Sequence, residues 1–267
     1  MHMPAAGFDA GFVSATLDDA LGSGARVFGI SGLQGSGKST LAAQLVDAAI
    51  ARGLHAIAVS VDDFYLDAPE RRRLARGIHP LLATRGPPGT HDVALARATL
   101  DALRDRRPVR LPAFDKLGDR RLPDAQGREA RDVDLVVFEG WFLGVPAEPD
   151  EALATAVNAL ERDEDSDGAW RHYCNDALAR DYPALWQRID RLLFLQPPGF
   201  DIVPGWRWQQ EQALQSLDPA RAGMTRAQVE RFVQHYERVS RQALRTLPGI
   251  ADVVVPLDDR RRVATAE

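Results

Sequence analysis

Five short apolar runs divide the chain, and each has the length of a buried strand. They lie at residues 26–31, 55–61, 134–141, 191–195 and 251–256. Their apolar residues are mostly consecutive, which is typical of parallel strands covered by helices on both faces. Apolar residues at helical spacing occupy several of the intervals. Because strands and helices alternate, we expect right-handed crossovers and a three-layer α/β/α fold around a five-stranded parallel sheet.

The intervals between these runs predict the helices. We expect a short amphipathic helix in the N-terminal segment 1–24, a second helix ending near Arg52 and a third from Val93 to about Leu103. Further helices are expected at 170–186, at 203–217 and after Thr225, where Gln228 completes a capping box. Segment 197–245 would hold a lid and C-terminal helices. Residues 1–267 would form a single domain, because no second apolar core is evident.

Composition narrows the functional classes. The 267 residues carry a formal net charge of −5, which argues against a general nucleic-acid binder. Cys174 is the only cysteine, so a disulfide framework within the chain and a cysteine-rich metal site are excluded. The chain has no run of 18 apolar residues and no signal-peptide pattern. We therefore expect a soluble cytoplasmic protein with no membrane partner.

The most specific chemistry follows the first predicted strand. Residues 32–39 match G-x-x-x-x-G-K-[ST] in full, and a chain of this length would match by chance only roughly 1% of the time. Glycines let backbone N–H groups converge on an anion at a helix N-terminus. Lys38 supplies a charge for the β- and γ-phosphates, and Ser39 supplies a hydroxyl for Mg²⁺. The predicted ATP-binding residues are Gly32, Leu33, Gln34, Gly35, Ser36, Gly37, Lys38, Ser39 and Thr40.

Carboxylates follow two other predicted strands. Asp62 and Asp63 come after the run 55–61, and Glu139 lies near the end of the run 134–141. Ligands of open α/β sheets bind beyond the carboxyl ends of strands, so we expect these groups at the edge that holds the phosphate loop. Glu139 would hold or orient Mg²⁺, and a carboxylate of the Asp pair would act as base on an acceptor hydroxyl. A turn or helix cap is the alternative interpretation of the Asp pair.

Two loops are candidates for binding an acceptor. Arg85, His91 and Asp92 flank a turn rich in Pro and Gly, and an Arg is what a small carboxylate substrate needs. Thr90 or Asp92 could also cap the helix that follows. Lys116, with Arg120, lies in the polar connector 107–132, which is either a substrate loop or a surface loop or hairpin.

The remaining charged residues have simpler interpretations. The runs 71–73, 161–167 and 260–262 are expected to be solvated. Arg207, early in the predicted helix 203–217, is either a surface residue or a lid arginine for the transferring phosphoryl group.

Together these motifs resemble the D-glycerate 3-kinase family, which is related to phosphoribulokinase, uridine kinase and bacterial pantothenate kinase. The resemblance rests on the phosphate loop, Asp-Asp-Phe-Tyr at 62–65, Arg-Gly-x-x-Gly-x-His-Asp at 85–92 and Phe-Glu-Gly-Trp at 138–141, and it covers about residues 25–245. It implies that Asp62 is the general base, that Arg207 belongs to the lid, and that Asp63 and Tyr65 contribute to the acceptor site. Phe114 stands where the plant-like pattern has Tyr, and the stretch after Lys116 is shorter than in the plant version.

We therefore expect an ATP- and Mg²⁺-dependent kinase that phosphorylates D-glycerate, with the 3-position implied by the family alone. Kinases of another small acceptor (a nucleoside, pantothenate or a sugar acid) are the nearer alternative. A regulatory NTPase is the more distant one, although the guanine-specificity element Asn-Lys-x-Asp is absent from the sequence. The sequence does not indicate the oligomeric state.

Overall fold

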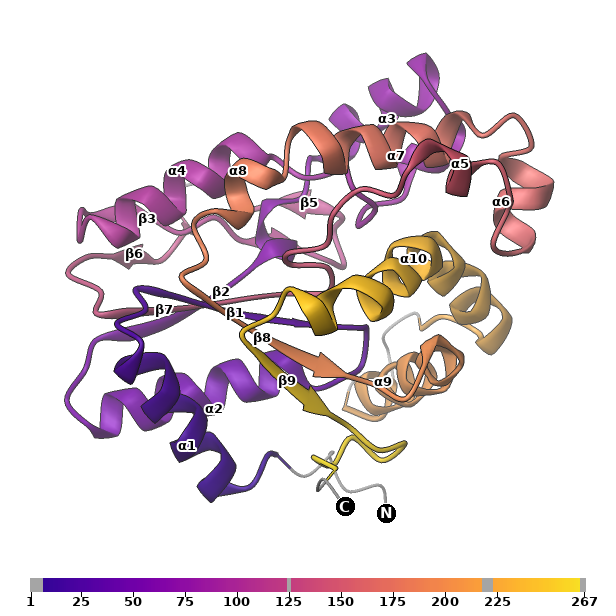
Figure 1. The fold of residues 1–267 in the computed structure, drawn as a ribbon. Helices are drawn as coiled ribbons and strands as arrows, with labels where there is room; N and C mark the ends of the chain where they lie inside the picture. The colour runs from indigo at the N-terminus through magenta and orange to yellow at the C-terminus, as the bar shows by residue number, and fades with distance from the viewer. Residues whose placement is uncertain (1–6, 124–125, 218–222, 265–267) are drawn as a thin grey trace.

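The computed structural model describes residues 7–123, 126–217 and 223–264 (Figure 1). Parts of three predicted segments fall outside these ranges, including residues 124–125 of the polar connector. Residues 1–6 of the N-terminal segment and residues 218–222 of the lid segment lie outside the described residues.

The fold is built around a five-stranded parallel sheet with the order β2-β7-β1-β8-β9. Each strand coincides with one predicted apolar run, so the predicted parallel α/β sheet is confirmed. The strands are β1 (Val27–Gly32), β2 (Ala56–Ser60), β7 (Leu135–Gly140), β8 (Arg191–Gln196) and β9 (Val253–Pro256).

Helices connect these strands. Those that begin at Lys38, Val93, Ala169, Val203 and Arg226 lie where the sequence predicts, whereas the helix at 68–77 was not predicted. They are α1 (Ala10–Gly22), α2 (Lys38–Ala51), α3 (Ala68–Gly77), α4 (Val93–Arg104), α5 (Asp150–Leu153), α6 (Ala159–Glu164), α7 (Ala169–Arg180), α8 (Pro183–Trp186), α9 (Val203–Leu217) and α10 (Arg226–Thr246). The predicted capping box of Thr225 and Gln228 opens α10. The single predicted helix 170–186 is wrong. It divides into α7 and α8, because Pro183 has no N–H to continue the hydrogen-bond ladder.

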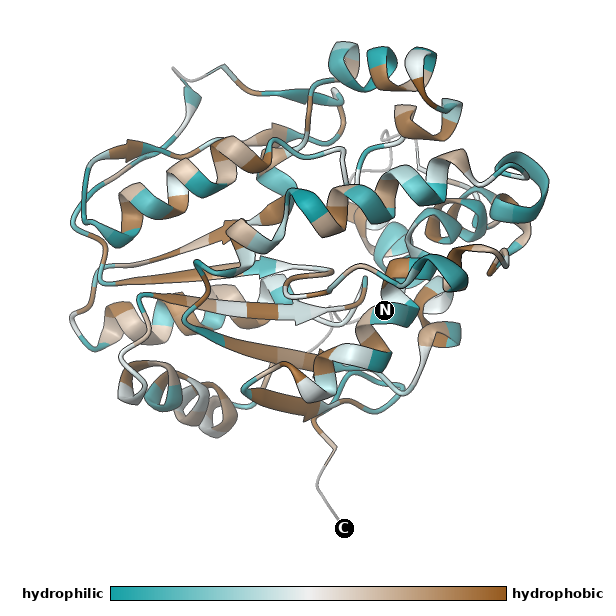
Figure 2. Cartoon of the chain, turned by 45° about the horizontal axis from the view of Figure 1, so that its top comes forward, coloured by the Kyte–Doolittle hydropathy of each residue, from teal (hydrophilic) through white to brown (hydrophobic). Residues whose placement is uncertain are grey.

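Alternate residues of the strands point into two separate apolar cores. In β1, Val27 packs in the core formed with α4, α7 and α10, whereas Phe28 packs in the core formed with α1 and α2. Figure 1 shows α1 and α2 on one face of the sheet and α4, α7 and α8 on the other. The strands are largely brown in the hydropathy colouring, whereas the covering helices alternate teal and brown (Figure 2). The sheet is therefore buried on both faces, as its consecutive apolar residues predict.

The polar connector 107–132 contains two short antiparallel ribbons, which agrees with the hairpin interpretation. In one ribbon β3 (Val109–Arg110) pairs with β6 (Glu129–Ala130), and in the other β4 (Phe114–Asp115) pairs with β5 (Arg120–Arg121). The second ribbon contacts the 3₁₀ turn η1 (Val61–Phe64), which follows β2. The connector thus reaches the carboxyl edge of the sheet.

The acidic run 161–167 is only partly solvated, contrary to the sequence prediction. The side chains of Glu161 and Asp165 are fully buried. Glu161 forms an ion pair with Arg238 of α10 at 2.7 Å, and Asp165 forms one with Arg171 of α7 at 2.9 Å. Burial of these carboxylates is tolerated because each has a guanidinium partner.

Among the described residues, no helix has the length and apolar character needed to cross a membrane.

Candidate active site

Residues 33–37 connect β1 to α2 in the conformation of an anion-binding loop. Gly35 and Gly37 have φ angles of 80° and 94°, which glycine adopts without a steric penalty. The hydroxyl of Ser36 is buried and has no hydrogen-bond partner among the described residues. An anion held between this loop and the N-terminus of α2 would supply that partner. The loop therefore fits the phosphates of ATP.

Gly35 is also required because α9 packs against it. A Cβ at this position would lie 2.7 Å from Cβ of Trp206. Arg261 Nε donates a 2.6 Å hydrogen bond to the Gly35 carbonyl, and its guanidinium lies 5.0 Å from the centre of the Trp206 ring. The predicted solvation of the run 260–262 is therefore wrong for Arg261. The N-terminal end of α9, where Arg207 follows Trp206, lies beside the phosphate loop.

Lys38 and the two predicted magnesium ligands lie together at the start of α2. Lys38 Nζ donates to the Leu33 carbonyl at 3.2 Å. Burial lowers the pKa of Lys38, although Glu139 and Asp62 act in the opposite direction. Ser39 Oγ donates to Glu139 Oε1 at 3.0 Å. Carboxylate and hydroxyl oxygens are ligands that suit Mg²⁺, so this adjacent pair fits that ion.

Strand register explains why the carboxylates meet the loop. Glu139 of β7 lies opposite Ile30 of β1 and opposite Ser60 of β2. From these positions β1 continues into the phosphate loop, and β2 continues into the turn that holds Asp62. The predicted convergence at the carboxyl edge of the sheet is present.

Asp62 and Asp63 have different surroundings within η1. Asp62 Oδ2 accepts a 2.6 Å hydrogen bond from Lys116 Nζ. Burial raises the pKa of Asp62, but Lys116 and the Tyr65 hydroxyl outweigh it and hold that pKa below its usual value. Asp63 Oδ2 instead accepts from the backbone N–H of Ser60 at 3.0 Å, and burial raises the pKa of Asp63 to about 6. Asp63 is thus placed as the cap of the turn, whereas the Asp62 carboxylate is paired with the Lys116 ammonium.

Arg85 belongs to a wall formed with the β4–β5 ribbon. Its Nη1 donates to Asp119 Oδ1 at 2.6 Å, and its Nη2 donates to the Lys116 carbonyl at 3.0 Å. Its guanidinium lies 5.7 Å from the centre of the Phe114 ring. Asp119 also accepts from Arg71, whose side chain is buried, so the predicted solvation of the run 71–73 is wrong for Arg71.

His91 and Asp92 are adjacent in sequence but differ in position. The His91 ring is buried 4.9 Å from the Tyr65 ring, and its Nδ1 lies 2.7 Å from the Tyr182 hydroxyl. Burial lowers the pKa of His91 to about 4, so the ring is neutral at pH 7. Its Nε2 has no hydrogen-bond partner in the described part of the chain. Asp92 caps α4 by accepting from the Leu95 N–H at 2.9 Å, which is the capping alternative that the sequence offered.

The ribbon brings a different arginine inward from the one predicted. Arg120 is 68% exposed and lies 3.7 Å from Asp115, so it is not placed as an acceptor ligand. Arg121 is less exposed, and its Nη2 donates to the Tyr65 carbonyl at 3.2 Å and to Asp92 at 3.3 Å. Successive side chains of a strand point to opposite faces, so sequence alone could not select between the two.

Arg207 lies between α9 and α10. Its Nη2 forms a 2.9 Å ion pair with Glu211, and its guanidinium lies 5.8 Å from the centre of the Phe232 ring. The Arg207 side chain is 14% exposed, and its Nη1 has no hydrogen-bond partner within the described ranges. Arg207 is therefore more buried than a surface arginine.

Tyr236 and Trp141 carry polar side-chain atoms close to the loop that holds Arg85. The sequence analysis assigned no role to either polar atom. The Tyr236 hydroxyl donates to the Arg85 carbonyl at 2.8 Å, and the Tyr236 ring lies 5.0 Å from the Trp141 ring. Trp141 Nε1 is buried without a partner among the described residues. Tyr236 falls on the apolar stripe of the predicted helix, where its hydroxyl was the only signal for a polar role.

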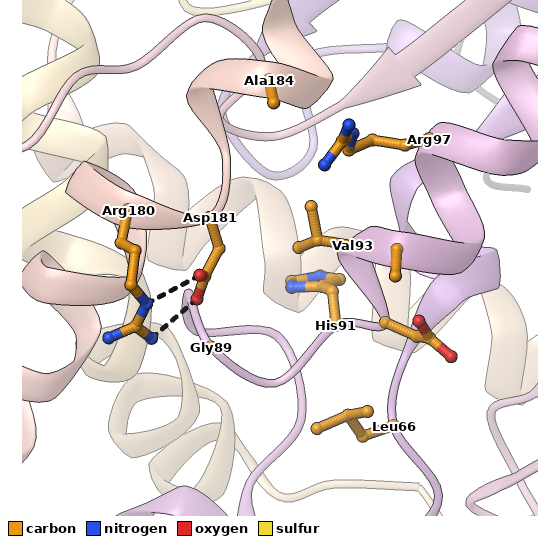
Figure 3. A pocket seen from close by; sticks show the side chains of 10 residues that line it. Leu66, Gly89, His91, Val93, Arg97, Arg180, Asp181 and Ala184 are labelled. Atoms are coloured by element: carbon orange, nitrogen blue, oxygen red, sulfur yellow. Dashed lines mark hydrogen bonds and ion pairs between the residues drawn. The ribbon is translucent and has the colours of Figure 1, made fainter.

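A separate pocket of about 410 Å³ lies between α4 and the junction of α7 with α8. Figure 3 shows Arg97 on one side of it and the Arg180–Asp181 ion pair on the other, with His91 between them. His91 is shared with the site described above, but the phosphate loop, Asp62 and Lys116 do not line this pocket. We therefore do not assign phosphoryl transfer to it.

Comparison with known proteins identifies the family. The chain is 36% identical over 222 residues to the uncharacterized kinase mug58 of Schizosaccharomyces pombe, covering 79% of this chain and 78% of that protein. This chain belongs to the P-loop kinases related to D-glycerate 3-kinase. The kinase is also 29% identical over 232 residues to the chloroplastic D-glycerate 3-kinase of Arabidopsis thaliana, covering 83% of this chain and 48% of that protein. No profile of a known protein family matches the chain.

A solved structure supports the same family. The kinase superimposes on the D-glycerate 3-kinase of Cryptococcus neoformans with a TM-score of 0.78, at 28% identity and with 97% of each chain covered. The kinase is thus an ATP-dependent P-loop kinase with an α/β fold.

Proposed function

We propose that this kinase transfers the γ-phosphoryl group of ATP to the 3-hydroxyl of D-glycerate. The observation that carries the proposal is a set of side-chain nitrogen atoms in the network of contacts that begins at Asp62. Lys116 and Arg85 supply two cations on one wall. His91 Nε2 and Trp141 Nε1 are buried without partners among the described residues. A small acceptor with a carboxylate and hydroxyl groups would satisfy such a set, whereas an apolar acceptor would leave His91 Nε2 and Trp141 Nε1 unpaired. The names of the Arabidopsis and Cryptococcus relatives point to the same acceptor.

The residues have distinct parts in the proposed reaction. Asp62 takes the proton as the acceptor O–H bond breaks, the hydroxyl oxygen forms a bond to the γ-phosphorus, and ADP leaves with the electrons of the broken P–O bond. Lys38 and the loop amides hold the β- and γ-phosphates. Bound Mg²⁺, held by Ser39 and Glu139, would neutralise phosphate charge. Arg207 would close on the phosphates from α9. A low pKa of Asp62 is compatible with its role as the proton acceptor, because phosphoryl transfer needs mainly positioning and charge neutralisation.

The proposal is tested by ADP release from ATP and Mg²⁺, with and without D-glycerate. We expect strong D-glycerate dependence that falls roughly 10²-fold or more in Asp62→Asn, the range for loss of a general base. Asp63→Asn is the matched control and should retain turnover, because Asp63 caps the turn. ADP release that requires a nucleoside, pantothenate or a sugar acid would replace the acceptor. Rapid ADP release without any acceptor would favour a regulatory NTPase.

A further inference from the structure

The carboxylate assigned as the base is already occupied by a cation. Lys116 Nζ lies 2.6 Å from Asp62 Oδ2, a short charge-assisted hydrogen bond. A proton acceptor in this state is engaged as an ion pair, so a substrate hydroxyl has to compete with an ammonium for it. The Asp62 side chain is 24% exposed and the Lys116 side chain is 57% exposed, so the pair lies at the mouth of the site.

The backbone that carries Lys116 is fixed by hydrogen bonds, whereas its side chain is held only at its end, by Asp62. Asp115 Oδ1 accepts from the N–H groups of Leu117 and Gly118, each at 3.0 Å. The carbonyl of Lys116 is held by Arg85 at 3.0 Å. The ammonium is therefore carried on a flexible four-carbon stem from an anchored turn, and it can move to another anion while the turn stays in place.

We propose that Lys116 is a specificity-determining residue that covers Asp62 until the carboxylate of an anionic acceptor draws its ammonium away. This inference rests on the proposed function and extends it by assigning to Lys116 the selection of an anionic over a neutral acceptor. An acceptor carboxylate exchanges one ion pair for another, and Asp62 is then free to take the hydroxyl proton. A neutral polyol offers no replacement, so the ion pair would have to break uncompensated. Arg85, on the same wall, would hold the second oxygen of the carboxylate.

The decisive measurement is the ratio of kcat/KM for D-glycerate to kcat/KM for glycerol, its neutral analogue. We expect this ratio to fall at least 10-fold in Lys116→Met, with glycerol turnover increased, and to be partly restored in Lys116→Arg. Arg120→Met changes an exposed cation of the same ribbon and should leave the ratio within twofold of wild type. An equal loss for both acceptors in Lys116→Met would overturn the inference, because Lys116 would then serve both acceptors alike.

A second readout does not depend on the acceptor. Uncovering Asp62 should raise acceptor-free ATP hydrolysis several-fold in Lys116→Met, and the added Asp62→Asn change should abolish the rise. Unchanged hydrolysis would overturn the inference. Failure of the proposed function is distinguishable, because wild-type protein would then show no D-glycerate-dependent turnover. In that case a preferred acceptor without a negative charge would also overturn the assignment of Lys116, and an anionic one would support it.

Discussion

Replacing Glu161 with Gln should lower the free energy of unfolding by about 3 kcal/mol. The Glu161 side chain is fully buried, and it accepts from Arg238 Nε at 2.8 Å and from Arg238 Nη2 at 2.7 Å. Removing one partner of a buried ion pair costs roughly 3–5 kcal/mol, because the other charge stays buried. Glu148 also contacts Arg238, at 3.0 Å, so we expect the lower end of that range. This is a large part of the roughly 5–15 kcal/mol that stabilises a typical domain.

The assay is urea unfolding followed by the fluorescence of the five tryptophans. Glu164→Gln is the matched control, because Glu164 lies on the same helix and pairs with Arg231 at 2.6 Å, but these side chains are 44% and 50% exposed. An exposed pair contributes about 0–1 kcal/mol. A loss below 1 kcal/mol in both variants would refute the reasoning that burial makes the Glu161 pair a major support of α6 against α10.

Three further changes test the site. Asp63→Asn should stabilise the fold by up to about 3 kcal/mol at pH 8 and not at all near pH 3. The pKa of Asp63 in the folded protein, about 6, lies above its ordinary value. Ionised Asp63 therefore opposes folding at high pH, and protonation removes that cost. A change in Tm that does not depend on pH would contradict this reasoning. Arg85→Ala should raise the acceptor KM by roughly 10-fold or more with the ATP KM little changed, whereas Arg120→Ala should leave both unaltered. Ser39→Ala should raise the Mg²⁺ concentration needed for half-maximal activity, and an unaltered requirement would exclude Ser39 as a ligand.

The sheet could be predicted because its signals are local. Each strand is a short run of apolar residues, and a parallel sheet covered on both faces needs no polar alternation to mark it. The phosphate loop is likewise a contiguous pattern whose conformation follows from its glycines, two of which have φ angles of 80° and 94°. Asp62 and Glu139 could then be placed, because the carboxyl ends of parallel strands share one edge.

Residues that depend on distant partners could not be predicted in the same way. Glu161 is buried because Arg238, 77 residues later, meets it across two helices. Arg71 is buried because Asp119, 48 residues later, folds back over it. The inward position of Arg121 depends on the pairing of a two-residue strand, and the polar role of Tyr236 depends on where α10 crosses the loop of Arg85. None of these contacts has a signature in the residues on either side.

The product of the reaction tests the central claim most directly. The purified kinase would be incubated with ATP, Mg²⁺ and D-glycerate, and the mixture would be followed by phosphorus NMR. We predict that a phosphomonoester on the 3-hydroxyl of glycerate and ADP appear in equal amounts, and that both form roughly 10²-fold more slowly or slower with Asp62→Asn. Inorganic phosphate as the only new phosphorus product, or an ester that forms equally well with Asp62→Asn, would contradict the account.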